Sequence, residues 1–95
     1  MNWMIYGANG YTGELAARHA VDTGERPILA GRSAAVAELA AELGLEHRIF
    51  GLDAIDLTGV DAVLHCAGPF SRTSTPMVDA CLAAGAHYLD LTGEW

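Results

Sequence analysis

The sequence contains no lysine, and this absence excludes several kinds of nucleotide and carbonyl chemistry. A Walker-type phosphate loop needs a lysine after its last glycine, so the chain does not carry one. An enzyme that uses a Schiff-base lysine, or a Tyr-x-x-x-Lys pair, is excluded for the same reason. The five basic residues are all arginines and oppose twelve acidic ones, which gives a net charge of −7. This balance argues against nucleic acids and anionic membranes as partners, because both require a basic face.

Cysteine and long apolar runs are also scarce. The two cysteines, Cys66 and Cys81, lie on a predicted strand and a predicted helix, where we expect them to pack in the core. We expect His65 and His87 to be packed histidines of buried strands rather than catalytic groups. The cysteines and histidines lack any tight ligand spacing, so the sequence predicts no metal site. No apolar run approaches about 18 residues and no secretory signal is present, so we expect a cytoplasmic protein.

A glycine-rich stretch near the N-terminus carries the main functional signal. The sequence YGANGYTG places three glycines three residues apart, between a short apolar strand and a helix. Gly7 allows a sharp turn out of the strand, Gly10 leaves room for a pyrophosphate, and Gly13 lets the helix pack closely. The first N–H groups of the helix then face the phosphates. The stretch predicts a dinucleotide cradle, with Asn9 where the commoner pattern has its second glycine; an ordinary tight turn is the alternative.

Strands and helices alternate along the rest of the chain. We expect strands at Trp3–Tyr6, Pro27–Ala30, His47–Phe50, Asp61–Cys66 and His87–Leu91. We expect helices over Gly10–Thr23, from an N-cap at Ser33 to Gly44, and from an N-cap at Thr75, with Pro76 first in the helix, to Gly85. Small and apolar residues recur at helical spacing in all three, as in helices that pack on a sheet.

This alternation predicts a single α/β domain over residues 1–95 with a doubly wound parallel sheet. The expected strand order is 3-2-1-4-5, which is typical of Rossmann-like folds. In such a sheet the ligand binds at the carboxyl ends of the first and fourth strands, where the order reverses. We therefore expect a dinucleotide-binding domain.

The residue after the second strand indicates which dinucleotide is bound. NAD sites place an acidic residue there for the ribose 2′-hydroxyl, but this chain has Arg32 followed by Ser33. A guanidinium suits a 2′-phosphate, so the sequence favours NADP (NADPH) over NAD. Asp53, after the third strand, is a candidate for the adenine amino group, with a simple turn aspartate as the alternative. Ala67 and Gly68, after the fourth strand, would bring bare backbone near the ribose or nicotinamide.

Four segments together resemble a known family: YGANGYTG (6–13), AGR (30–32), CAGPF (66–70) and TPMVDACLAAGAHYLDLTGE (75–94). The chain resembles the N-terminal NADP-binding domain of saccharopine dehydrogenase-like proteins, which include trans-acting enoyl reductases. The resemblance implies three groups of contacts: the pyrophosphate with Gly7, Asn9, Gly10, Tyr11 and Thr12, the 2′-phosphate with Arg32 and Ser33, and the inner ribose side with Ala67 and Gly68.

Proteins of this family continue into a larger region that shapes the substrate pocket, whereas this chain stops at Trp95. We therefore expect the N-terminal part of a longer protein, with the substrate site supplied by a missing C-terminal domain or a partner. The catalytic residues and the substrate stay undefined, and hydride transfer by this chain alone is not expected. A non-catalytic NADP(H)-sensing module, by analogy with NmrA-like proteins, is the alternative function. The last strand would be a sheet edge, so we also expect self-association, most simply as a homodimer, with a soluble monomer as the alternative because of the charge of −7.

Overall fold

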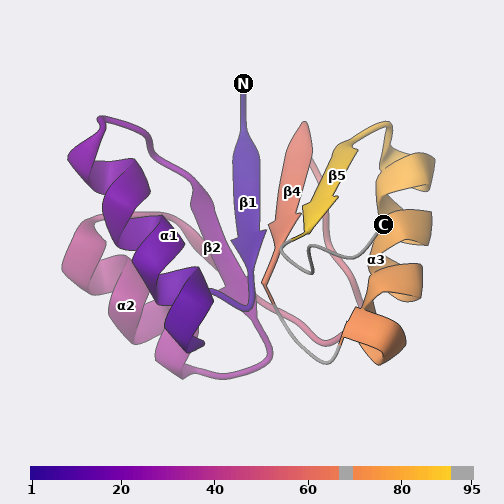
Figure 1. Ribbon diagram of the computed structural model, residues 1–95, viewed down its shortest axis with the longest axis horizontal. Helices are drawn as coiled ribbons and strands as arrows, with labels where there is room; N and C mark the ends of the chain where they lie inside the picture. The colour runs from indigo at the N-terminus through magenta and orange to yellow at the C-terminus, as the bar shows by residue number, and fades with distance from the viewer. Residues whose placement is uncertain (67–69, 91–95) are drawn as a thin grey trace.

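The computed structural model describes residues 1–66 and 70–90, and the side chains of all of these except 70–74. Within that range a five-stranded sheet lies between helices (Figure 1). Its strands are β1 (Trp3–Tyr6), β2 (Ile28–Gly31), β3 (His47–Ile49), β4 (Ala62–His65) and β5 (His87–Asp90). Its helices are α1 (Tyr11–Asp22), α2 (Ala35–Leu43) and α3 (Phe70–Ala84). The strand order is β3-β2-β1-β4-β5, so the predicted topology is confirmed.

Every neighbouring pair of strands is parallel, and the register brings their carboxyl ends to one edge. Tyr6 at the end of β1 is opposite Ala30 on one side and His65 on the other. The carboxyl ends of β1, β2 and β4 therefore lie next to one another. This is the edge at which the sequence predicts that the ligand binds.

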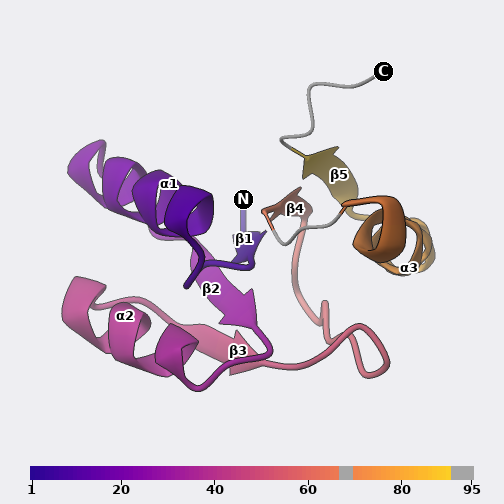
Figure 2. The same ribbon diagram turned by 60° about the horizontal axis from the view of Figure 1, so that its bottom comes forward.

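The two faces of the sheet are covered by different helices (Figure 2). Under α1 and α2, apolar side chains of β1 and β2 pack on the buried stripes of these helices; this cluster comprises Ile5, Ala8, Ala17, Leu29, Val36, Leu39 and Ala40. The opposite face packs on α3 and on the segment between β3 and β4, and includes Met4, Tyr6, Val63, Leu57, Val60, Met77 and Cys81. The buried stripes follow the helical spacing expected from the sequence. The chain is therefore wound on both faces of its sheet.

The ends of the helices agree with the sequence in two cases and differ in the third. Helix α1 is one residue shorter at each end than expected. Helix α2 ends at Leu43, and its C-cap is Gly44, whose φ of 70° is left-handed. The predicted start of α3 was wrong, because the helix begins at Phe70 and includes Pro76. A proline inside a helix removes one hydrogen bond and crowds the carbonyl four residues earlier, at a cost of about 3 kcal/mol or more, which packing must offset. The buried contacts of Met77 and Cys81 stabilise the turns that follow it.

The buried histidine and cysteine predictions had mixed outcomes. His65 and Cys81 are buried, as expected. His87 is exposed, so its prediction as a packed histidine was wrong. The reason is its place on β5, which is an edge of the described sheet and has strand β4 on one side only. Cys66 is half-buried; it packs on the α1–α2 cluster but also reaches the carboxyl edge of the sheet.

Candidate cofactor-binding cleft

The turn after β1 is fastened to β2 by backbone hydrogen bonds. The N–H groups of Gly7 and Ala8 both donate to the carbonyl of Ala30, at 2.8 and 3.2 Å. The N–H of Gly10 donates back to the carbonyl of Gly7 at 3.1 Å, which closes the turn before α1 begins. Gly7 has a φ of 84°, a value that residues with a side chain rarely adopt. The first glycine is therefore required by the turn itself.

The second and third glycines of the stretch have different surroundings. A Cβ atom at Gly13 would lie 2.2 Å from the carbonyl oxygen of Gly7 and 2.8 Å from the Cα of Ala8. At Gly10 the nearest atom would be 3.4 Å away, which is an ordinary contact, and the backbone there is extended with φ −77°. Packing therefore requires glycine at 13, whereas nothing within the described chain requires it at 10.

The N-terminus of α1 faces the same edge of the sheet. Gly10 is its N-cap residue and supplies no side-chain hydrogen bond to the helix. The N–H of Glu14 bonds to the carbonyl of Gly10 at 2.8 Å and is the first to close a helical turn. Within the described chain, the N–H groups of Tyr11, Thr12 and Gly13 make no such bond. They and the helix dipole favour an anion at this position.

The turn after β2 lies against the turn after β1. A Cβ atom at Gly31 would be 2.9 Å from Cγ2 of Val36 and 3.2 Å from Oδ1 of Asn9, so glycine permits this close approach. The Oγ of Ser33 accepts a hydrogen bond from the N–H of Ala35 at 3.1 Å. The N-cap residue of α2 is Ala34, so the predicted N-cap at Ser33 was one residue too early, although Ser33 still binds the first N–H of the helix. This bond uses the oxygen as an acceptor and leaves the hydroxyl proton for another partner.

Arg32 differs from the other arginines whose side chains are described. Arg18 and Arg48 form ion pairs with carboxylates. Arg26 donates a hydrogen bond to the carbonyl of Gly44. The exposed guanidinium of Arg32 makes neither a hydrogen bond nor an ion pair with any described residue. Among the arginines with described side chains, Arg32 is therefore the one uncommitted cation, and it lies next to the glycine turn.

Tyr6 closes the floor of this region from β1. Its hydroxyl donates to the carbonyl of Phe50 at 3.2 Å, and the two rings stack with centroids 5.2 Å apart. Burial raises the pKa of the Tyr6 hydroxyl, while the nearby charges of Arg32 and Asp53 lower and raise it respectively. The phenol is therefore neutral, and it lies close enough to both charges to respond to them.

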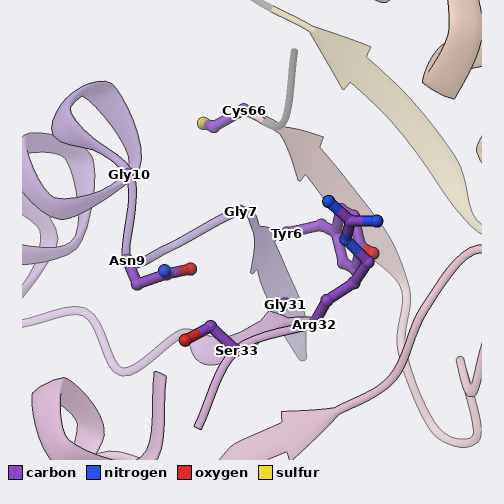
Figure 3. Close-up of a pocket in the computed structure, with 8 residues that line it drawn as sticks. All are labelled: Tyr6, Gly7, Asn9, Gly10, Gly31, Arg32, Ser33 and Cys66. Atoms are coloured by element: carbon purple, nitrogen blue, oxygen red, sulfur yellow. The ribbon is translucent and has the colours of Figure 1, made fainter. Parts of the chain in front are cut away.

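These residues surround one cleft of about 570 Å³ at the carboxyl edge of the sheet (Figure 3). Of the predicted site residues, the cleft is lined by Gly7, Asn9, Gly10, Arg32 and Ser33. Tyr11, Thr12 and Gly13 lie at the start of α1, and Asp53 lies beyond β3; these four do not line it. The predicted residues Ala67 and Gly68 lie outside the described residues.

Three lining residues were missed by the sequence reasoning: Tyr6, Gly31 and Cys66. A signal for each existed, because all three stand at or just after the carboxyl end of a strand. The N–H of Cys66 donates to the carbonyl of Tyr6 at 2.8 Å, which holds it beside the first turn. Burial raises the pKa of the Cys66 thiol to about 11, so it is a neutral thiol at pH 7.

A doubly wound parallel sheet with a glycine turn, an open helix N-terminus and a cleft at the switch point defines a Rossmann-like dinucleotide-binding domain. Residues 3–94 match the family described as the saccharopine dehydrogenase NADP binding domain. The chain belongs to this family, so both the family resemblance and the choice of NADP as cofactor are confirmed.

Curated relatives are considerably longer than this chain. It is 36% identical over 104 residues to a trans-acting enoyl reductase of Mycobacterium ulcerans, covering 96% of this chain and 25% of that protein. A trans-acting enoyl reductase of Mycobacterium tuberculosis is 35% identical, with the same coverage. The chain thus spans about a quarter of the length of the curated relatives it matches.

Solved structures share the fold at lower sequence identity. Citrobacter triphenylmethane reductase complexed with NADP(H) has a TM-score of 0.75 and 22% identity, over 94% of this chain and 36% of that one. Yeast methylglyoxal/isovaleraldehyde reductase complexed with NADPH has a TM-score of 0.73 and 20% identity, over 90% and 33%. These likenesses support the Rossmann-like architecture. Within the described ranges, no helix has the length and apolarity that crossing a membrane requires.

Proposed function

We propose that the cleft binds NADP(H) with its pyrophosphate on the glycine turn and its 2′-phosphate at Arg32. The observation that carries the proposal is that the glycine turn and Arg32 line the same cleft. Gly10 leaves room on the turn, and the N–H groups at the start of α1 suit phosphate oxygens. Arg32 supplies the cation for the 2′-phosphate, and the Ser33 hydroxyl donates a hydrogen bond to it. Asn9, Tyr11 and Thr12 complete the pyrophosphate side, as the family resemblance implies.

The whole protein is, in this proposal, an NADP-dependent oxidoreductase of which this chain is the cofactor-binding domain. The names of the curated relatives suggest an enoyl group as the acceptor. NADPH would supply a hydride to one carbon of the double bond, and a proton would complete the other. Polypeptide outside these 95 residues, or a partner, would hold the substrate against the nicotinamide.

The proposal is tested by titrating the chain with NADP⁺ and with NAD⁺ in a calorimeter. We expect saturable binding of both, tighter for NADP⁺, because only NADP⁺ carries the phosphate that Arg32 would bind. Equal affinity for both would remove Arg32 from the proposal, and binding of neither would overturn the proposed function.

A second part of the proposal concerns the partner of β5. This strand is an edge of the described sheet, and its Leu89 is 59% exposed. Unpaired edge groups and exposed apolar side chains favour pairing with further protein, either a second copy or a further domain. We expect the isolated chain to self-associate in sedimentation experiments as its concentration rises. Leu89→Lys should weaken this association, since lysine on an edge strand opposes pairing; a strictly monomeric native chain would exclude the homodimer.

A further inference from the structure

The carboxylate of Asp53 and the side chain of Arg32 both border the space where a Cβ atom of Gly51 would lie. A Cβ atom at Gly51 would lie 2.8 Å from Oδ1 of Asp53 and 3.7 Å from Cδ of Arg32. Both side chains therefore approach the same point, although they come from segments after different strands, β3 and β2. Glycine at 51 leaves the space that this approach needs.

The two groups lie close together without forming an ion pair. No nitrogen of Arg32 comes within 4.0 Å of a described carboxylate oxygen, whereas Arg48 lies within that distance of two carboxylates. Both groups also lie near the phenol of Tyr6, whose pKa is raised mainly by burial, lowered by Arg32 and raised by Asp53. Figure 3 shows the Arg32 side chain directed toward Tyr6 and away from Ser33.

This placement puts a negative charge next to the proposed phosphate site. Both Arg32 and Asp53 are exposed, so their interaction passes partly through solvent and salt screens it. A 2′-phosphate at Arg32 would still lie within a Debye length, about 10 Å at 0.1 M salt, of the Asp53 carboxylate. An NAD ribose has an uncharged 2′-hydroxyl at that position and would not experience the repulsion.

We infer that Asp53 is a selectivity-determining residue whose carboxylate opposes binding of a 2′-phosphate at Arg32 and narrows the preference for NADP over NAD. The inference rests on the proposed function of the cleft. It differs from a role for Asp53 as the hydrogen-bond acceptor of the adenine amino group, since adenine is common to both dinucleotides. The two roles therefore predict opposite effects of removing the charge.

The test compares the native chain with Asp53→Asn, which removes the charge and keeps the shape of the side chain. We expect the affinity for NADP⁺ to rise about threefold to tenfold, as for one exposed like charge near a phosphate. The affinity for NAD⁺ should change by less than about twofold, because its 2′-hydroxyl carries no charge. Asp22→Asn is the matched control: this exposed aspartate lies at the far end of α1, and its replacement changes the net charge equally. It should alter neither affinity.

The salt dependence of the NADP⁺ affinity distinguishes this charge effect from a structural role of Asp53, because a structural role would not depend on salt in this way. At about 1 M salt, where the Debye length is about 3 Å, the gain of Asp53→Asn over the native chain should largely disappear. A gain that is insensitive to salt would overturn the inference, and so would an equal loss of both affinities, which would make Asp53 an adenine contact. The native chain is titrated first. If it binds neither dinucleotide, the proposed function fails, and this result is distinct from a failure of the inference about Asp53.

Discussion

The two sides of the cleft are built from different parts of the polypeptide. On the side of β1 and α1 the surface is backbone: Gly7 and Gly10 shape the turn, and the helix N-terminus supplies N–H groups. On the side of β2 the lining is made by the side chains of Arg32 and Ser33, and Asp53 approaches Arg32 at Gly51 without lining the cleft. The first side can recognise the pyrophosphate that every dinucleotide has, while the second can distinguish one dinucleotide from another. Affinity and selectivity should therefore be separable by mutation.

The largest effect should come from filling the backbone side, where two glycines offer a matched pair. Gly10→Val should abolish binding of both dinucleotides and leave the chain folded, because the Cβ meets no closer atom than one at 3.4 Å. Gly13→Val should instead destabilise the chain by about 3 kcal/mol or more, since its Cβ would overlap the Gly7 carbonyl. Calorimetric titration measures the dinucleotide affinity of Gly10→Val. Urea unfolding followed by circular dichroism measures the free energy of unfolding of Gly13→Val. A folded Gly10→Val chain that still binds would disprove the placement of the pyrophosphate.

On the side-chain surface, Arg32→Ala should act on one dinucleotide only. Losing a charge-assisted contact to phosphate costs about 1.5–3 kcal/mol, so the affinity for NADP⁺ should fall about 10- to 150-fold. Affinity for NAD⁺ should hardly change, and neither should the free energy of unfolding, because Arg32 is exposed and makes no ion pair with a described residue. Equal losses for both dinucleotides would assign Arg32 to the adenine or to the fold, and the comparison between the two sides would fail.

Ser33→Ala should have the smallest effect and should affect both stability and selectivity. Without the bond to Ser33, the Ala35 N–H at the start of α2 loses its partner, at a cost of about 1 kcal/mol in the free energy of unfolding. The affinity for NADP⁺ should fall about threefold to tenfold, because one exposed hydroxyl donor to the phosphate is lost while Arg32 remains. Ser33→Thr retains the hydroxyl and should restore both properties. If the alanine variant lost stability but kept its NADP⁺ affinity, the hydroxyl would serve only the helix.

The backbone side could be predicted from the sequence because glycine spacing and strand–helix alternation are local signals. The turn at Gly7, the packing role of Gly13 and the order β3-β2-β1-β4-β5 all follow from patterns within a few residues of one another. A Ser33 hydroxyl at the start of α2 was predictable for the same reason, although the N-cap residue is Ala34. Each depends on the chemistry of one residue type at one position.

The side-chain surface was predicted only in part, because it depends on contacts between distant segments. Arg32 and Ser33 were identified by their place after the second strand. The approach of Asp53 to Arg32 above Gly51 is set by how the segment after β3 folds back, which has no short-range signal. The length of α3 was also misjudged, because the preference of Pro76 for a first helical position gave way to packing. The exposure of His87 depends on which strand forms the edge.

The central strand of this sheet is the first one that a ribosome would make. Strand β1 begins at Trp3, yet its two neighbours start at Ile28 and Ala62. Asn2, just before β1, is also bonded to Asp61: its N–H donates to the Asp61 carboxylate, and its carbonyl accepts from the Asp61 N–H. Both edges of β1 can therefore be paired only after β2, and then β4, have been synthesised. Pairings between segments so far apart in sequence form slowly, so we expect the order of translation to delay closure of this sheet until most of the domain has emerged.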